Sequence, residues 1–266
     1  MTQRYKLIAF DIDGTILNAH YQVCSRLKKI VQRLKQNGYI FTIVSARFPH
    51  SALSIAKDLG LELHEAIITL NGGFITNGLS EVIFSNTFQS ISVNEHLNMI
   101  NKNIAVSYYN GFTWVVDKYN KYVNSEINII NWMPQKFDIS NIAHVNKICL
   151  MGDNEHLIDA QKTLQSIDDS LLVAFSHPNY LELATKDISK YSGLMKYAQK
   201  LDIKANEIIA FGDGENDIPM LSNVGLGVAM DNASAHVKKI AKDIASHHME
   251  EGVAIYLEEL IAKGVL

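Results

Sequence analysis

Short, predominantly apolar runs of four or five residues recur along the chain. Runs of this length suit strands rather than helices, and unbroken apolar strands are typical of a parallel sheet that is covered on both faces. The runs are Leu7–Phe10, Ile40–Val44, Ala66–Thr69, Ile208–Phe211 and Leu226–Met230. Apolar residues at helical spacing predict helices over Ser25–Gln36 and Ser51–Leu59, with Gly38 and Gly60 as their stop signals. The alternation of strands and helices predicts a doubly wound α/β sheet.

The middle of the chain has another pattern. From about Val82 to Thr185, it predicts a strand, helix, hairpin and helix, and then a strand, helix and hairpin. The expected hairpin turns are Asn110-Gly111 and His177-Pro178-Asn179, and the helices expected over one face lie near Val93–Asn103 and Glu155–Gln165. The sequence therefore predicts a core formed by residues 1–84 and 186–266, with an inserted α+β domain formed by residues 85–185.

Composition narrows the class of protein. The 266 residues are 47% hydrophobic and 20% charged, which is ordinary for a globular protein. The net charge of -4 does not favour binding to nucleic acid, which usually requires a basic face. The first apolar run stops at Asp11, too early for a signal peptide, and no run of about 18 apolar residues predicts a membrane span. Cys24 and Cys149 are expected to be free thiols. We expect a cytoplasmic monomer or small homo-oligomer that binds neither nucleic acid nor membrane.

Polar residues follow four of the predicted strands directly. Because the carboxyl ends of parallel strands meet at one edge of a sheet, these residues are expected to converge there. They are Asp11 and Asp13, then Ser45-Ala46-Arg47, then Asn71-Gly72-Gly73, and finally Gly212-Asp213-Gly214-Glu215-Asn216-Asp217.

Convergence of these acids requires a cation. Two like charges about 4 Å apart repel by roughly 4 kcal/mol at an effective dielectric constant of 20. Oxygen ligands select a hard ion, and Mg²⁺ fits a site that also holds a phosphate. The predicted metal-site residues are Asp11, Asp13, Asp213 and Asp217. Thr15, Ser45 and Asn216 suit phosphate oxygens, and Gly14, Gly212 and Gly214 let backbone N–H groups approach an anion.

Each motif also has a purely structural explanation. Asp11-Ile12-Asp13-Gly14 could be a simple turn, although it is not a calcium-binding EF-hand loop, because Gly14 stands at position four and Gln22 replaces the final glutamate. The Gly212–Asp217 segment could be a turn before a helix whose first turn contains Pro219. Their shared position at strand ends favours a common function.

Together these segments resemble the four motifs of the haloacid dehalogenase superfamily of phosphatases. The motifs are Asp11-x-Asp13-Gly14-Thr15, Ser45 after a strand, a lysine before the last third of the chain, and Gly212-Asp213-x-x-Asn216-Asp217. The tail "GVAMDNASAHVKKIAKDI" with "EEGVA" is similar to the Cof-like branch, and the insertion resembles its C2-type cap. Ser45-Ala46-Arg47 departs from the branch's usual Thr-Gly-Arg but keeps the hydroxyl. Of Lys186 and Lys190, the segment Ile188-Ser189-Lys190 fits the family pattern, so Lys190 is predicted.

The resemblance implies a Mg²⁺-dependent phosphatase of small phosphorylated metabolites, with sugar phosphates first. In the family scheme Asp11 is the nucleophile and forms an aspartyl-phosphate, and Asp13 is the general acid and base. Mg²⁺ would contact Asp11, the Asp13 carbonyl and Asp213, while Asp217 would act through water or by orienting Lys190. Lys190 and Ser45 would hold phosphate and assist catalysis, and Gly14, Thr15, Arg47 and Asn216 are further candidates for binding substrate. The alternatives are a phosphotransferase or mutase on the same scaffold, and a non-catalytic phosphate-binding module.

The resemblance also implies that the inserted domain selects the organic part of the substrate. Its aromatic residues are better interpreted as core than as a sugar-stacking surface, whereas His177 and Asn179 are better candidates for facing the site. The aromatic residues considered are Tyr108, Tyr109, Trp114 and Trp132. His247-His248 has no further spaced ligands, so a zinc site is not predicted.

Overall fold

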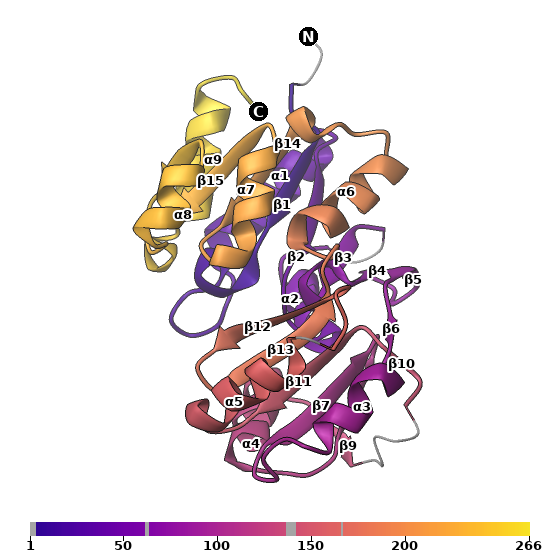
Figure 1. Cartoon of the computed structure of the whole chain (residues 1–266). Helices are drawn as coiled ribbons and strands as arrows, with labels where there is room; N and C mark the ends of the chain where they lie inside the picture. The colour runs from indigo at the N-terminus through magenta and orange to yellow at the C-terminus, as the bar shows by residue number, and fades with distance from the viewer. Residues whose placement is uncertain (1–3, 62–63, 137–141, 166) are drawn as a thin grey trace. The chain divides into compact units, whose positions relative to one another are not determined.

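A computed structural model of the chain describes residues 4–61, 64–136, 142–165 and 167–266. The chain divides into two compact units (Figure 1). The core unit comprises Met1–Arg47, Ala52–Phe84 and Ser189–Leu266, and the inserted unit comprises Phe48–Ser51 and Ser85–Ile188. The second boundary lies three residues beyond the expected 185/186. Residues 186–188 bond within the inserted unit: the Lys186 N–H donates to the Ser170 carbonyl and the Ile188 N–H to the Thr185 carbonyl.

The core unit contains an eight-stranded sheet in the order β16-β15-β14-β1-β2-β3-β4-β5. From β16 to β3 all neighbouring strands are parallel, and β4 runs antiparallel to β3. All five predicted strands are present. The bounds are β1 Leu7–Phe10, β2 Ile40–Val44, β3 Ala66–Thr69, β4 Phe74–Asn77, β5 Val82–Ser85, β14 Ile208–Gly212, β15 Leu226–Met230 and β16 Asp243–Ala245.

Helices cover both faces of this sheet. Ile8 and Phe10 of β1 pack in one cluster with α1, α2 and α9, whereas Leu7 and Ala9 pack in another with α6, α7 and α8. Burial on both faces is the reason that β1 is continuously apolar. The helices are α1 Ser25–Gln36, α2 Pro49–Asp58, α6 Lys190–Lys200, α7 Ile218–Asn223, α8 Ala235–Ile240 and α9 Gly252–Ala262. Short helical turns are η1 Ile12–Ile16, η2 Leu70–Gly72, η4 Ala205–Glu207, η5 Glu215–Asp217 and η6 His248–Glu250. The prediction of a doubly wound α/β core is confirmed.

Two of these helices were predicted from their apolar spacing. Helix α1 has the predicted bounds, and the Cys24 sulfur accepts a hydrogen bond from the Leu27 N–H at its start. Helix α2 begins at Pro49, two residues before the predicted start. Proline is favoured at the first helical position because its fixed φ suits the helix and its missing N–H is not needed there. None of the helices in the described ranges is long and apolar enough to cross a membrane.

The inserted unit contains a six-stranded sheet in the order β12-β13-β11-β7-β8-β9. Helices α3 and α5 pack on one face of it, against Tyr108, Ile148 and Leu150. The bounds are β6 Phe88–Gln89, α3 Ile91–Leu97, β7 Ala105–Asn110, β8 Thr113–Val116, α4 Lys121–Ile130, β9 Gln135–Lys136, β10 His144–Val145, β11 Lys147–Met151, α5 Asn154–Leu164, β12 Leu171–His177 and β13 Tyr180–Thr185. Helix α3 ends well before the predicted Asn103. The Asn101 side chain accepts a hydrogen bond from the Asn103 N–H at 2.9 Å, which forms a turn instead of a further helical turn.

The first predicted hairpin exists, but its predicted turn is wrong by one residue. Asn110 pairs with Thr113, so Gly111 and Phe112 form the turn. Gly111 has a φ of 53°, and its N–H donates to the Asn146 side-chain oxygen at 2.7 Å. This contact with a distant residue fixes the register. In the second hairpin His177 pairs with Tyr180, which leaves Pro178-Asn179 as the turn.

Candidate functional site

Lys190 lies between two carboxylates of the core unit. Its Nζ donates to Asp11 Oδ1 and to Asp217 Oδ1, both at 2.7 Å. The three side chains are buried, with exposed fractions of 2%, 8% and 0%. The alternative lysine, Lys186, is exposed. The structure therefore brings together the ends of β1 and β14 through the first residue of α6.

Two glycines allow α6 to start this close to the sheet edge. A Cβ on Gly72 would lie 2.1 Å from the Ser189 carbonyl oxygen, and one on Gly193 would lie 2.7 Å from the Gly72 Cα. Ser189 caps the helix, since its hydroxyl accepts from the Ser192 N–H and the Ser192 hydroxyl caps the Ser189 N–H in return. The backbone packing and the cap together fix the direction in which Lys190 leaves the helix.

Asp217 is held by the loop that follows β14. Its Oδ2 accepts hydrogen bonds from the Asp213 N–H at 3.1 Å and the Gly214 N–H at 2.9 Å. A Cβ on Gly212 would lie 2.5 Å from the Asp217 Cγ, so only glycine fits there. Both oxygens of Asp217 thus have protein donors, one from this loop and one from Lys190.

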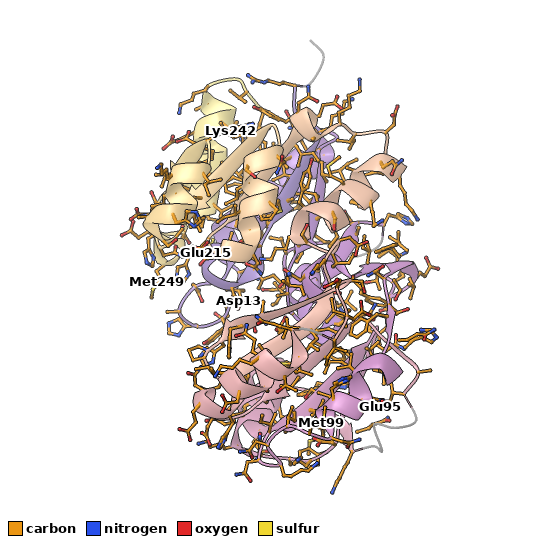
Figure 2. The ribbon with its side chains drawn as sticks, in the orientation of Figure 1. Asp13, Glu95, Met99, Glu215, Lys242 and Met249 are labelled. Carbon is orange, nitrogen blue, oxygen red and sulfur yellow. The ribbon has the colours of Figure 1, made fainter. Side chains whose placement is uncertain are left out.

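Asp213 lies against the turn that follows β1 (Figure 2 labels Asp13 and Glu215 in these two loops). The Thr15 hydroxyl donates to Asp213 Oδ1, and the Asn232 Nδ2 donates to Asp213 Oδ2, both at 3.1 Å. Gly14 has a φ of +70°, and a Cβ there would lie 2.2 Å from Asp213 Oδ2. Asn232 was not predicted, although it follows β15 and the rule of strand ends applies to it equally.

Three of the predicted metal-site residues form a group that can hold a cation. Carboxylate oxygens of Asp11, Asp213 and Asp217 lie within 4.8 Å of one another. Burial, together with the charge of Asp217, raises the pKa of Asp11 to about 8 against the opposing effect of Lys190. Burial and the Asp217 charge also raise the pKa of Asp213 to about 6. Acids that resist ionisation together, and that offer only oxygen, fit a hard divalent ion such as Mg²⁺.

Asp13 occupies a different place from these three acids. Both of its oxygens accept from Arg47, at 2.7 Å from Nε and 2.6 Å from Nη2. The Asp13 side chain is 54% exposed and that of Arg47 is 15% exposed. The Asp13 carboxylate is outside the group of three, and the predicted contribution of its main-chain carbonyl stays a prediction. The pairing of Asp13 with Arg47 was not predicted.

The remaining predicted substrate-binding residues lie in loops at the same edge. Ser45 is buried after β2, and its hydroxyl accepts from the Arg47 N–H at 3.2 Å. The exposed Asn216 donates through Nδ2 to the Asn71 side-chain oxygen at 3.2 Å. Asn71 has a φ of 60°, which asparagine tolerates better than most residues. Phosphate binding by these residues stays a prediction.

Several other residues that were considered from the sequence form hydrogen bonds with main-chain groups. His247 Nδ1 accepts from the Met249 N–H, and His248 Nδ1 lies 2.7 Å from the Leu17 carbonyl oxygen. In the inserted unit His177 Nδ1 accepts from the Asn179 N–H, and Asn179 Nδ2 donates to the Gly152 carbonyl. Whether His177 and Asn179 contact a substrate stays a prediction.

The aromatic residues of the inserted unit differ in burial. Tyr108, Tyr109 and Trp114 are buried, as the core interpretation requires. Trp132 is 43% exposed, and its ring stacks on His50 with centroids 3.8 Å apart. Three of the four aromatic residues therefore contribute to packing.

The chain is similar to known proteins in sequence and in fold. The sequence profile of the haloacid dehalogenase-like hydrolase family matches residues 8–257. A Haemophilus influenzae protein, described provisionally as a phosphatase, is 31% identical over 258 residues, covering 96% of this chain and 98% of that protein. The 5-amino-6-(5-phospho-D-ribitylamino)uracil phosphatase of Bacillus subtilis is 28% identical over 253 residues, covering 94% and 93%. A haloacid dehalogenase-like hydrolase from Bacteroides thetaiotaomicron has a crystal structure that matches with a TM-score of 0.88 at 30% identity, covering 96% and 99%.

These matches span nearly the whole chain, so they establish its class. The chain belongs to the haloacid dehalogenase-like hydrolases, within the Cof-like branch of phosphatases. It is therefore an enzyme of the phosphatase class, as the motifs predicted.

Proposed function

We propose that the enzyme is a Mg²⁺-dependent phosphatase that hydrolyses small phosphorylated metabolites, sugar phosphates first, through an aspartyl-phosphate on Asp11. The observation that carries the proposal is the buried Lys190, which bonds Asp11 and Asp217 beside Asp213. A carboxylate at the end of β1 needs no base to become a nucleophile, in contrast to a serine hydroxyl.

In the first step, the transfer of the phosphoryl group to Asp11, the side chains of the site would have separate roles. Lys190 holds Asp11 Oδ1, which leaves Oδ2 as the oxygen that attacks phosphorus. Asp11, Asp213 and the Asp13 carbonyl would hold Mg²⁺, while Asp217 keeps Lys190 oriented through its 2.7 Å hydrogen bond. When bound, the ion neutralises charge on the phosphoryl group and favours the ionised form of the acids that contact it.

Asp13 would act as the general acid and base only after a rearrangement. Both of its oxygens are bonded to Arg47, so the carboxyl cannot protonate a leaving group from this position. A phosphoryl group is a competing anion for the guanidinium. We propose that substrate takes over part of the Arg47 contact and frees Asp13, which then protonates the leaving oxygen and later deprotonates the attacking water.

The phosphoryl group would be held by Ser45, Lys190, Thr15 and Asn216, with the backbone N–H groups near Gly14. The preference for sugar-like substrates rests on the relative from Bacillus subtilis, whose name describes a phosphate ester on a ribityl chain. Selection of the organic part by the inserted unit stays a prediction.

A panel of phosphorylated metabolites assayed for phosphate release tests the proposal. Asp11→Asn should lower kcat/KM by at least about 10³-fold, because the amide is a poor nucleophile. Asp58→Asn removes an aspartate that pairs with Lys28 on the surface, and it should keep the wild-type rate. Excess EDTA should abolish activity and Mg²⁺ restore it. Wild-type turnover by Asp11→Asn would rule out the covalent scheme, and full activity under EDTA would rule out the metal.

A further inference from the structure

Asn232 joins three segments of the core unit around Asp213. Its Nδ2 donates to Asp213 Oδ2 at 3.1 Å and to the Gly14 carbonyl at 2.9 Å, and its Oδ1 accepts from the His248 N–H at 3.2 Å. An amide has two N–H donors and one carbonyl acceptor. The two oxygens and the one N–H around it therefore allow a single orientation of the side chain.

The backbone near Asn232 is itself firmly placed. The Ala233 N–H donates to the Met230 carbonyl at 2.9 Å in the turn after β15. Ser234 then caps α8 by accepting from the Val237 N–H at 3.3 Å. The third partner, His248, begins η6, the turn in which Figure 2 labels Met249. The side chain of Asn232 therefore extends to Asp213 from a turn whose backbone is held by hydrogen bonds.

With this contact, both oxygens of Asp213 are held from outside its own loop. Thr15 holds Oδ1, Asn232 holds Oδ2, and the missing side chain of Gly14 leaves room for the carboxylate. A hydrogen bond from a neutral amide fixes a carboxylate without adding charge to a cluster that already contains three acids. Groups that orient metal ligands in this way typically contribute about 10–100-fold to metal affinity.

We propose that Asn232 is a positioning residue for the metal site: it orients the Asp213 carboxylate, and thereby sets the affinity for Mg²⁺. The inference rests on the proposed function, because it assumes that Asp213 is a ligand of the ion. It is distinct from substrate binding, since Asp213, the Gly14 carbonyl and the His248 N–H already engage both the amide nitrogen and the amide oxygen of Asn232.

The test is calorimetric titration of chelator-treated protein with Mg²⁺ alone, with no substrate present. Asn232→Ala should weaken Mg²⁺ binding by about 10–100-fold, while kcat at saturating Mg²⁺ should fall much less. Asn232→Ser keeps one short donor and should give an intermediate affinity. Asn223→Ala removes an exposed asparagine that bonds Pro219 and Ser222 within α7, and it should bind Mg²⁺ as wild type does.

The outcomes separate the two proposals. If wild type binds Mg²⁺, Asp213→Asn does not, and both Asn232 variants bind like wild type, the positioning role is overturned and the metal site stands. A lower melting temperature with unchanged Mg²⁺ affinity likewise overturns it, because that result describes a purely structural residue. If wild type itself does not bind Mg²⁺, the metal site of the proposed function and this inference both fall.

Discussion

Asp11→Asn should make the metal-free protein less sensitive to rising pH, although the same change removes the nucleophile. Asp11 is buried close to Asp217 and Asp213, and its pKa is raised from 3.8 to about 8, foremost by burial. Between these values the native state holds a proton that the unfolded state has lost. The stability contributed by this group is therefore complete below pH 3.8 and is lost as the pH rises towards 8.

The magnitude follows from proton linkage. One extra proton on the native state lowers the free energy of unfolding by about 1.4 kcal/mol for each pH unit of increase. From pH 5 to pH 8 the wild type should therefore lose up to about 4 kcal/mol through Asp11. An asparagine resembles the protonated acid at every pH, so the variant should lack this loss.

Urea unfolding in EDTA at pH 5, 6.5 and 8 measures the effect. The difference in unfolding free energy between Asp11→Asn and wild type should increase with pH in favour of the variant, while Asp58→Asn should run parallel to wild type. Adding Mg²⁺ at pH 8 should stabilise wild type and not Asp11→Asn, because a ligand stabilises only the state that binds it. Parallel curves for wild type and Asp11→Asn would refute the assignment of a buried, charge-resisting carboxyl at position 11.

Three further substitutions have directions set by the structure. Lys190→Met should lower the unfolding free energy at pH 8 by about 3–5 kcal/mol, because it leaves two buried carboxylates without their cation; an unchanged urea midpoint would contradict this. Gly14→Ala should weaken Mg²⁺ binding at least about tenfold by displacing Asp213, and calorimetry with wild-type affinity would disprove it. Lys147→Met should cost about 1–3 kcal/mol in thermal unfolding, because Glu182 loses its 3.0 Å ion pair and keeps only the hydrogen bond from the Ser176 hydroxyl.

The sequence predicted the core best where local pattern and tertiary environment agree. The apolar strands are buried on both faces, so their continuous apolar pattern matches their environment. Strands β1, β2, β3 and β15 begin and end as predicted. The hairpin near Gly111 was predicted one residue early because the Asn110-Gly111 signal is local, whereas the register depends on the side chain of Asn146. A contact between residues so far apart in the sequence cannot be predicted from the few residues around the turn.

In the candidate site, too, the features that follow from strand ends were predicted, and those that depend on distant contacts were not. Asp11, Asp213 and Asp217 were predicted to meet, because each follows a strand or lies in the loop after one, and parallel strands share an edge. The pairing of Asp13 with Arg47 could not be predicted, since it depends on rotamers in two separate loops. Asn232 could have been found by applying the same rule to β15. It was missed because the prediction started from the repulsion between acids, and a neutral amide does not contribute to that repulsion.

If the proposed function holds, the charges around Lys190 also predict an order of binding. Without an ion, Asp11 keeps its proton at neutral pH, and the other three predicted acids, when ionised, bring three negative charges against one positive charge each on Lys190 and Arg47. A phosphate ester adds about 1.5 to 2 more negative charges at neutral pH, so in the absence of an ion it would enter a field that repels it. Substrate should therefore bind weakly until a divalent ion arrives, and raising the substrate concentration cannot substitute for the ion.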